Sequence, residues 1–424
     1  MKFILKGVLI LLCFGYINVI ESSRVLELSD RFLDVRKDGQ WLVMFYAPWC
    51  AHCKRLEPIW AHVAQALHNT NIRVGRVDCT RFTGMATEFG IAGFPTILFL
   101  KGDAQHTFKG DRTKEEIVNF AVRLSGPPVQ QLTKLESLET VQLTKPLFFL
   151  YIGEMIGNLW DAYLSIAEIL QPHAFFYSVS TKLVDHHTHP VVAVYKEDEY
   201  YFFADSENFE NIDSGQLNSS LYQWINTERF STFPKVTRGN IHQIMMTNKY
   251  LVLAIVEENK LQEISPDMLE FRDMVESVIR KNRDKFHKYF QFGWIGSPEL
   301  ANSIAMSVLP LPHLLVINST TNHHHIPEEE PRQMTIASVT AFLERIHNQS
   351  APAYGGNTLV VRMYRTYFEA RTSLAEMWQG NPVLTAVLFG LPLGFLSLIC
   401  YSICCADIMD ADEEEEDITH EKKE

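Results

Sequence analysis

The sequence repeats one order of apolar segments about every 100 residues. Each repeat begins with an apolar run, which is followed by a helical stretch and a second apolar run. A proline then begins a third apolar run, and a helical segment closes the repeat. Near-continuous apolar runs are typical of central strands that are covered on both faces. The order therefore predicts three α/β domains in series. One large irregular domain is the alternative, but it would not explain the recurring proline. The opening runs are WLVMFYA from Trp41, PLFFLYI from Pro146 and YLVLAIV from Tyr250, and the prolines are Pro95, Pro190 and Pro312.

Both ends of the chain carry apolar segments that direct it to a membrane. Residues 1–22 have Lys2 and Lys6 beside a short apolar run, which is the layout of a secretory signal peptide. A retained membrane anchor is the alternative. Residues 383–405 contain no charged side chain. As a helix they would extend about 34 Å, enough to cross the hydrocarbon core of a bilayer. We therefore expect one transmembrane helix.

Two signals disagree about the orientation of this helix. Arg362, Arg365 and Arg371 precede the span, so counting basic residues alone would place the large N-terminal part in the cytosol. A signal peptide carries long domains across the membrane regardless of that count. The glycosylation sequons at Asn218, Asn318 and Asn348 also all precede the span. We therefore expect a single-pass type I protein with its large part in a lumen.

The domain borders follow from these features and from the linkers between repeats. The polar stretches SGPPVQQ and NQSAPAYGGN contain proline and glycine, which interrupt helices and strands. The predicted borders are 1–22 for the signal peptide, 23–127, 128–230 and 231–350 for the three domains, 351–382 for a linker and juxtamembrane helix, 383–405 for the span, and 406–424 for an acidic cytosolic tail.

Cys50 and Cys53 follow the first apolar run and are separated by Ala51 and His52. Where a strand passes into a helix, the first cysteine of such a pair lies at the helix N-terminus, and free N–H groups stabilise its thiolate. Cys50 would attack a disulfide, and Cys53 would resolve the mixed disulfide. Too few further ligands are nearby for a zinc site, so we expect no metal. A purely structural disulfide would close almost no loop.

The formal net charge of −13 argues against nucleic acid as a partner, because binding phosphates requires clustered Lys and Arg. Of the seven cysteines, Cys79 is expected to fill a semi-buried position at a strand end, with a regulatory thiol as the alternative. Cys400, Cys404 and Cys405 lie near the end of the span, where they are either palmitoylation sites or plain membrane residues.

Three motifs resemble the catalytic thioredoxin-like domain of the protein disulfide-isomerase family: FYAPWCAHCKRLEPIW from Phe45, FPT from Phe94 and DRTKEEIVNF from Asp111. With two further units lacking the cysteine pair, the span and its FGLPLG sequence, the chain is similar to three-domain members of the transmembrane thioredoxin-related branch. The resemblance implies an α/β fold of three tandem thioredoxin-like domains followed by one transmembrane helix. It also implies residence in the endoplasmic reticulum membrane.

The resemblance further implies a thiol–disulfide oxidoreductase, without a cofactor, that acts on folding secretory or membrane proteins. Pro95 matches a cis-proline that faces the cysteine pair, and its backbone neighbour Phe94 would pair with an extended substrate. Arg112 matches an arginine that approaches the second cysteine and lowers its pKa. His52 would favour the reduced thiolate electrostatically, and Ala51 replaces a glycine. The alternative function is a membrane-tethered chaperone or adaptor with little redox turnover.

The chain departs from this pattern at Met44, six residues before Cys50, where related enzymes carry a buried carboxylate that accepts a proton. Methionine cannot do so, and we expect slower resolution of mixed disulfides.

The remaining charged motifs are expected to be solvated. His323–His325 precede IPEEEP and are predicted to form a solvated loop. The acidic residues 410–417 are predicted to be a disordered tail, with sorting adaptors as possible partners. Lys422 gives only an imperfect dilysine retrieval signal.

Overall fold

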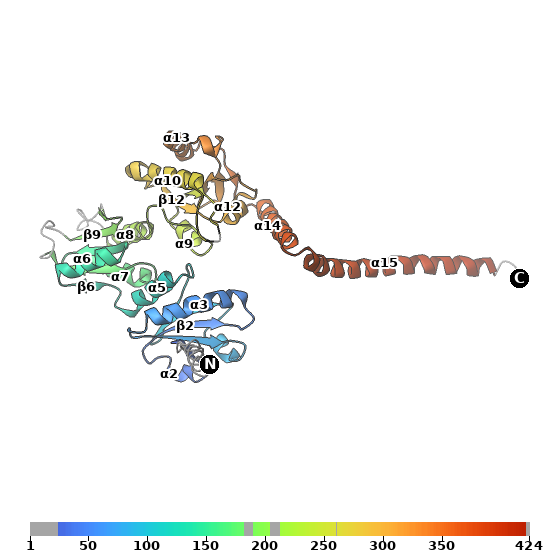
Figure 1. Ribbon diagram of the computed structural model, residues 1–424, viewed down its shortest axis with the longest axis horizontal. Helices are drawn as coiled ribbons and strands as arrows, with labels where there is room; N and C mark the ends of the chain where they lie inside the picture. The colour runs from blue at the N-terminus through green and yellow to red at the C-terminus, as the bar shows by residue number, and fades with distance from the viewer. Residues whose placement is uncertain (1–23, 182–189, 204–212, 260, 421–424) are drawn as a thin grey trace, which may run out of the picture. The chain divides into compact units, whose positions relative to one another are not determined.

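The computed structural model describes residues 24–181, 190–203, 213–259 and 261–420, with side chains as far as residue 403. Within these residues the chain forms three five-stranded sheets followed by two long helices (Figure 1). It separates into two compact units, one made of the residues up to Lys249 together with Gln291–Gly293, and the other of the remaining residues from Tyr250 onward. The predicted signal peptide and Lys422 lie outside the described residues.

The first sheet has the strand order β1-β3-β2-β4-β5, with β1, β3 and β2 parallel and the last two strands antiparallel to their neighbours. The central strand is buried on both faces because its side chains alternate between two cores. Leu42 and Met44 pack on the side of α3 and α5, and Trp41, Val43 and Phe45 pack on the other side. The bounds are β1 (Leu26–Glu27), α2 (Phe32–Val35), β2 (Gln40–Tyr46), α3 (Ala51–Ala66), β3 (Ile72–Asp78), α4 (Thr83–Glu88), β4 (Thr96–Lys101), β5 (Ala104–Thr107) and α5 (Lys114–Ser125).

The second sheet repeats this topology, with the strand order β10-β9-β7-β8-β6. Its central strand β7 is parallel to β8 and antiparallel to β9, as β2 is to β3 and β4. A core of aromatic and aliphatic side chains lies between the sheet and helices α7 and α8. The bounds are β6 (Gln130–Leu132), α6 (Leu135–Thr144), β7 (Leu147–Ile152), α7 (Asn158–Leu170), β8 (Phe176–Val179), β9 (Val191–Lys196), β10 (Glu199–Phe202) and α8 (Ser214–Glu228).

The third sheet has the order β12-β11-β13-β14-β15 and differs at its edges. Its edge strand β15 comes from Tyr354–Gly355, after the last helix of the repeat, and pairs with β14. The first two sheets instead take an edge strand, β1 or β6, from a segment that precedes their middle strand. Part of the stretch predicted as a linker is therefore a strand. The bounds are α9 (Ile241–Met245), β11 (Tyr250–Ile255), α10 (Pro266–Lys281), α11 (Arg283–Phe286), β12 (Phe290–Ile295), α12 (Pro298–Ala305), β13 (His313–Asn318), β14 (His323–His325), η4 (Pro331–Gln333), α13 (Ile336–His347) and β15 (Tyr354–Gly355).

Two helices end the described chain. Helix α14 (Leu359–Gly380) has no buried residue, and Ser303 Oγ donates to Glu369 Oε1 at 2.6 Å. Helix α15 (Pro382–His420) includes an apolar stretch, Pro382–Ile403, that is long enough to cross a membrane and has a mean hydropathy of 2.3. The helix continues to residue 420, which corrects the prediction of a disordered acidic tail. A helix that is already nucleated is extended at low cost by residues such as Ala, Glu and Met.

Candidate active site

Cys50 lies where strand β2 passes into helix α3. It is the N-cap of the helix, with φ −75° and ψ 112°, and the backbone N–H of Cys53 donates to Cys50 Sγ at 3.2 Å. The first N–H groups of a helix have no partner within the helix, and the helix dipole places partial positive charge there. The sulfur of Cys50 therefore occupies a position that favours a thiolate.

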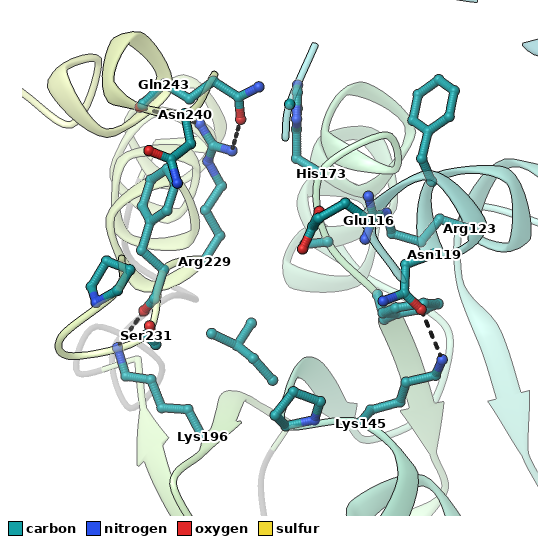
Figure 2. Close-up of a pocket in the computed structure, with 18 of the residues that line it drawn as sticks. Glu116, Asn119, Arg123, Lys145, His173, Lys196, Arg229, Ser231, Asn240 and Gln243 are labelled. Carbon is teal, nitrogen blue, oxygen red and sulfur yellow. Dashed lines mark hydrogen bonds between the residues drawn. The ribbon is translucent and has the colours of Figure 1, made fainter. Parts of the chain in front are cut away.

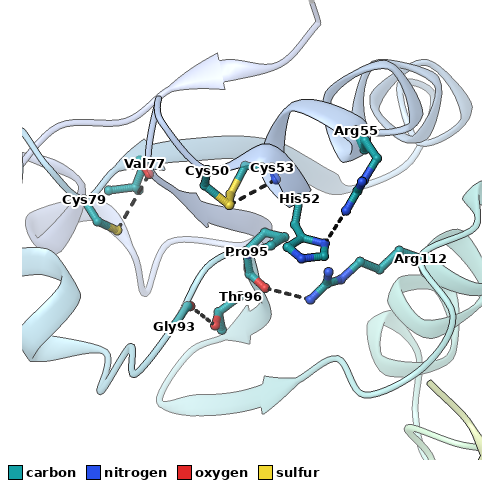
Figure 3. The surroundings of a disulfide bond; sticks show 10 residues. All are labelled: Cys50, His52, Cys53, Arg55, Val77, Cys79, Gly93, Pro95, Thr96 and Arg112. Carbon is teal, nitrogen blue, oxygen red and sulfur yellow. Dashed lines mark hydrogen bonds between the residues drawn. A yellow bond between two sulfur atoms is a disulfide. The ribbon is translucent and has the colours of Figure 1, made fainter. Parts of the chain in front are cut away.

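Cys50 and Cys53 form a disulfide with their Cα atoms 5.2 Å apart (Figure 3). Their side chains are nearly buried, with 6% and 3% exposed, and they pack against Ala47. A bond between residues three apart closes almost no loop and adds little stability. The pair is therefore placed for exchange chemistry more than for holding the fold together.

Two aromatic side chains border the disulfide. Trp49 immediately precedes Cys50 and is 72% exposed, which is unusual for so large an apolar side chain. Its ring makes an edge-on contact with Phe94, with the centroids 6.2 Å apart, and Phe94 also packs against the cysteine pair. These two rings form an apolar rim beside the sulfur atoms.

Pro95 and Arg112 meet next to this rim. The Phe94–Pro95 peptide bond is cis, and Thr96 Oγ1 donates to Gly93 O at 2.8 Å across the same turn. The guanidinium of Arg112 donates to Pro95 O at 3.3 Å. Arg112 is thus held on the turn that carries Pro95, and its predicted effect on Cys53 stays a prediction.

His52 and Ala51 occupy exposed positions in the first turn of α3. Arg55 Nη2 lies 2.7 Å from His52 Nδ1. Because a guanidinium has no acceptor, Nδ1 accepts this bond, and a neutral His52 then carries its proton on Nε2. Figure 3 shows His52, Pro95 and Arg112 around the disulfide.

Met44 lies in strand β2 with 1% of its side chain exposed. Its partner on the neighbouring parallel strand is Arg76. Arg76 forms ion pairs with the carboxylates of Glu27 and Glu57. The guanidinium also lies over the ring of Tyr46, at 5.3 Å from its centroid.

A cavity of about 250 Å³ opens beside the second cysteine. Its walls include Met44, Cys53, Glu57 and Arg76. Glu57 lies four residues after Cys53 in α3, and residues at this spacing share one helix face. Sequence reasoning missed Glu57, although its spacing from Cys53 was a usable signal.

Cys79 is 4% exposed and lies in the core on the other face of the first sheet. Its thiol contacts Val77 O at 3.8 Å, and burial raises its pKa from 9.0 to about 11. Such a thiol is protonated at neutral pH and reacts poorly. Cys400 is exposed in α15, whereas the side chains of Cys404 and Cys405 lie outside the described part of the chain.

The three sequons lie in different settings. Asn218 is exposed in α8, and Asn348 is exposed at the end of α13. Asn318 ends β13 and is partly buried, and its Oδ1 accepts the N–H groups of Thr320 and Thr321 at 3.0 and 3.2 Å. At least two of the three asparagines are therefore open to solvent in the folded chain.

The prediction that His323–His325 form a solvated loop is wrong. They form strand β14 between β13 and β15, and His324 and His325 are 3% and 7% exposed. Burial and neighbouring cations lower the pKa of His324 to about 4, so it is neutral at pH 7. Among the described residues, no group of three or more His, Cys, Asp or Glu could hold a metal ion.

Comparison with known proteins places this site in a family context. The family described as Thioredoxin matches residues 26–123, and one described as Thioredoxin-like domain matches residues 152–345. The chain is 34% identical to protein disulfide-isomerase TMX3 of Xenopus laevis over 406 residues, which cover 94% of this chain and 86% of the relative. It is 32% identical to the TMX3 protein of Homo sapiens, covering 92% and 84%. The predicted fold class is thereby confirmed.

Solved structures give weaker likenesses. The zinc-bound form of human ERp44 has 13% identity and a TM-score of 0.36, covering 77% of this chain and 89% of that chain. The first thioredoxin domain of mouse protein disulfide-isomerase A4 has 35% identity and a TM-score of 0.24, covering 25% and 79%. Because both TM-scores are low, neither likeness supports a further conclusion.

Proposed function

Because the chain belongs to the protein disulfide-isomerase family, together with the TMX3 proteins, we propose that Cys50 and Cys53 are the residues that carry out its disulfide exchange. The protein is a membrane-anchored thiol–disulfide oxidoreductase. The observation that supports the assignment is the N–H of Cys53 donating to Cys50 Sγ at the start of α3. This bond stabilises a thiolate at Cys50 and leaves Cys53 as the resolving group.

The exchange proceeds in two steps. The Cys50 thiolate attacks one sulfur of a client disulfide, a Cys50–client bond forms, and the other client sulfur leaves as a thiolate. The Cys53 thiolate then attacks Cys50 Sγ, displaces the client thiolate and closes the Cys50–Cys53 disulfide. The client gains two electrons and the pair loses them. The reverse sequence oxidises a client, and the redox poise of the compartment sets the direction.

Trp49 and Phe94 supply the contact surface for the client in this scheme. Their rings are adjacent, and Trp49 offers apolar area at low entropic cost because it has only two side-chain torsions. Pro95 and Arg112 border the same surface, joined by the hydrogen bond from the guanidinium to Pro95 O. An extended client segment would lie along this turn, with its sulfur directed at Cys50.

Glu57 takes the proton of Cys53 in our proposal. Cys53 must become a thiolate inside a nearly buried site, where an isolated thiol resists ionisation. The cavity beside Cys53 has room for water and is also lined by Glu57, so a water molecule can pass the proton from one to the other. Arg76 forms an ion pair with Glu57, which holds that carboxylate at the wall of the cavity.

The membrane arrangement in our proposal is type I, with the catalytic pair in the lumen of the endoplasmic reticulum and the three asparagines glycosylated. The signal-like N-terminus, the sequons and the one membrane-length apolar helix among the described residues support it. Mass shifts on treatment with endoglycosidase H test it, because sugars of that compartment remain sensitive. Loss of the shift in the triple variant Asn218→Gln, Asn318→Gln, Asn348→Gln is expected, and a wild-type chain that never shifts would contradict it.

The acidic tail and the domain borders complete the proposal. Residues 410–417 would contact sorting adaptors. Deleting these residues should therefore change the distribution of the protein among membranes.

The borders proposed for the three domains are 127/128 and 230/231. The first border falls between α5 and β6, and the second follows α8.

A trapping experiment tests the exchange itself. The Cys53→Ala variant of the full chain should accumulate mixed disulfides with clients in cells, because the resolving step is blocked. Changing Cys50→Ala in addition should abolish them, and Cys79→Ala alone should resemble the wild type. The absence of Cys50-dependent adducts would overturn the assignment.

A further inference from the structure

A second and larger cavity lies within the unit formed by the residues up to Lys249. Its volume is about 550 Å³, and neither Cys50 nor Cys53 lines it. Its lining residues come from stretches that are far apart in the sequence, within residues 107–123, 142–147, 172–175, 195–198 and 229–244. Nothing in the exchange chemistry uses this cavity.

Three basic side chains face the cavity with only neutral hydrogen-bond partners. Arg123 donates through Nε and Nη2 to Pro172 O, at 3.1 and 2.8 Å. Arg229 donates to Asn226 Oδ1 at 2.9 Å and to Gln243. Lys145 donates to Asn119 Oδ1 at 3.4 Å.

In the described part of the chain, no carboxylate lies within ion-pair distance of Arg123, Arg229 or Lys145. The acidic residues that line the cavity either accept hydrogen bonds from other groups or lie beyond ion-pair distance of these three cations. Asp111 accepts hydrogen bonds from Thr237 and Asn240, and Asp198 accepts one from the hydroxyl of Tyr195. Glu197 Oε1 accepts the backbone N–H of Thr232 at 2.9 Å. Glu116 is close enough to oppose the effect of burial on Arg123, but it forms no ion pair with it.

Burial and the neighbouring cations both change the pKa values of the basic groups in the lining. Burial lowers the pKa of Arg123 and of Arg229 to about 10. The pKa of His173 falls to about 4, first because of burial and then because Arg229, Arg123 and Lys109 repel a further positive charge. His173 is therefore neutral at pH 7, and both arginines remain charged.

Arg123, Lys145 and Arg229 are partly removed from water. Partial burial of a cation without a counter-charge is unfavourable, and an anion in the cavity would compensate it. Figure 2 shows Arg229 with Gln243 on one wall, and Arg123 with Lys145 on the other. The volume exceeds what one inorganic anion fills and falls in the range of small-molecule sites. Charge on both walls suits a molecule with an acidic group at each end.

We propose that this cavity binds a small organic dianion, one acidic group of which pairs with Arg123 and the other with Arg229. Arginine suits this role because its planar group binds a carboxylate or phosphate through two parallel hydrogen bonds. The site is independent of the cysteine pair. A Cys50→Ser, Cys53→Ser variant should bind the same anions, which separates failure of this proposal from failure of the exchange assignment.

Isothermal titration of the full chain in detergent tests the proposal with the organic dianions succinate, glutarate and adipate. Acetate and chloride at matched ionic strength are the controls. We expect saturable binding that is strongest for one dianion length. Arg123→Gln and Arg229→Gln should each weaken it about tenfold or more, because each removes a charged hydrogen-bond partner.

The matched control is Arg81→Gln, which removes an exposed arginine outside the cavity and should keep wild-type affinity. If Arg229→Gln fails to fold, Arg229→Lys retains the charge without the two-pronged geometry and should show an intermediate loss. Equal responses to dianions, acetate and chloride would overturn the proposal. Wild-type affinity in a folded Arg123→Gln variant would overturn it as well.

Discussion

Met44 and Arg76 are paired across the adjacent parallel strands β2 and β3, and Arg76 directs its guanidinium to Glu57 on α3 and to Glu27. Glu57 in turn lines the cavity that reaches Cys53. The carboxylate that lines this cavity with the resolving cysteine therefore belongs to the helix that carries the cysteines.

Replacing Glu57→Gln should slow the decay of the Cys50 mixed disulfide several-fold, because an amide cannot take the proton from Cys53. Met44→Glu should accelerate this decay. Combined with Glu57→Gln, it should restore the decay rate that Glu57→Gln alone lowers. Rapid acid quenching and gel separation of the adduct measure the rate. Glu115→Gln, which changes an exposed glutamate at the start of α5, is the control. An unchanged rate in Glu57→Gln would show that Cys53 loses its proton elsewhere.

His52→Ala should raise the pKa of the Cys50 thiol by about one unit, because the thiolate loses a nearby polar group that stabilises it. The alkylation rate of the reduced protein as a function of pH gives this value. The pair would then also become a weaker oxidant. Ala51→Gly, which changes the neighbouring exposed position, should leave the pH dependence of the alkylation rate nearly unchanged. A profile unaffected by His52→Ala would remove His52 from the site.

Cys79 should resist alkylation at pH 8 in the folded protein and react only after denaturation. Its pKa is about 11 in the folded state and near 9 when unfolded. Its stabilising contribution is thus complete below pH 9 and is lost as the pH rises toward 11, because the unfolded thiol ionises first. The wild type should therefore lose more stability than Cys79→Ala over this range, as thermal unfolding can measure. Fast labelling at pH 8 would contradict the buried placement.

Lys196 and Glu228 form an ion pair of 2.6 Å whose side chains are 1% and 6% exposed. Glu228→Gln should lower the free energy of unfolding by about 3 kcal/mol, because it removes a negative charge from beside a buried ammonium. Replacing both residues, with Lys196→Met and Glu228→Leu, should recover most of the loss. Urea unfolding followed by tryptophan fluorescence gives the values. A single variant as stable as the wild type would mean that water reaches the pair.

Much of the fold could be predicted from short stretches of sequence. The apolar runs from Trp41 and Pro146 each contain the middle strand of a sheet, and the run from Tyr250 contains β11, which lies between β12 and β13. An uninterrupted apolar run needs cover on both faces, so all three are interior strands. The span predicted at 383–405 corresponds to the apolar stretch Pro382–Ile403, since length and absence of charge suffice to find it. Cys50 lies at the start of a helix, where the motif predicted it.

The errors occurred where the decisive contact was distant in sequence. His324 is buried because Tyr354 pairs with it in strand β15, thirty residues later in a stretch predicted as a linker. The polar composition of both segments favoured loops, and the pairing outweighed it. The acidic tail was predicted to be disordered from its charge, but the preceding apolar helix extends through it.

The sequence by itself determined the number and order of the repeats, the position of the membrane helix and the identity of the cysteine pair. These depend on periodicity, length and spacing, which are local properties of the chain. The tertiary structure alone decided that Glu57 reaches the cavity of Cys53 and that Arg123 and Arg229 line a common cavity. Both depend on how side chains from separate elements pack, because packing sets which charges lose water and which partners remain within reach.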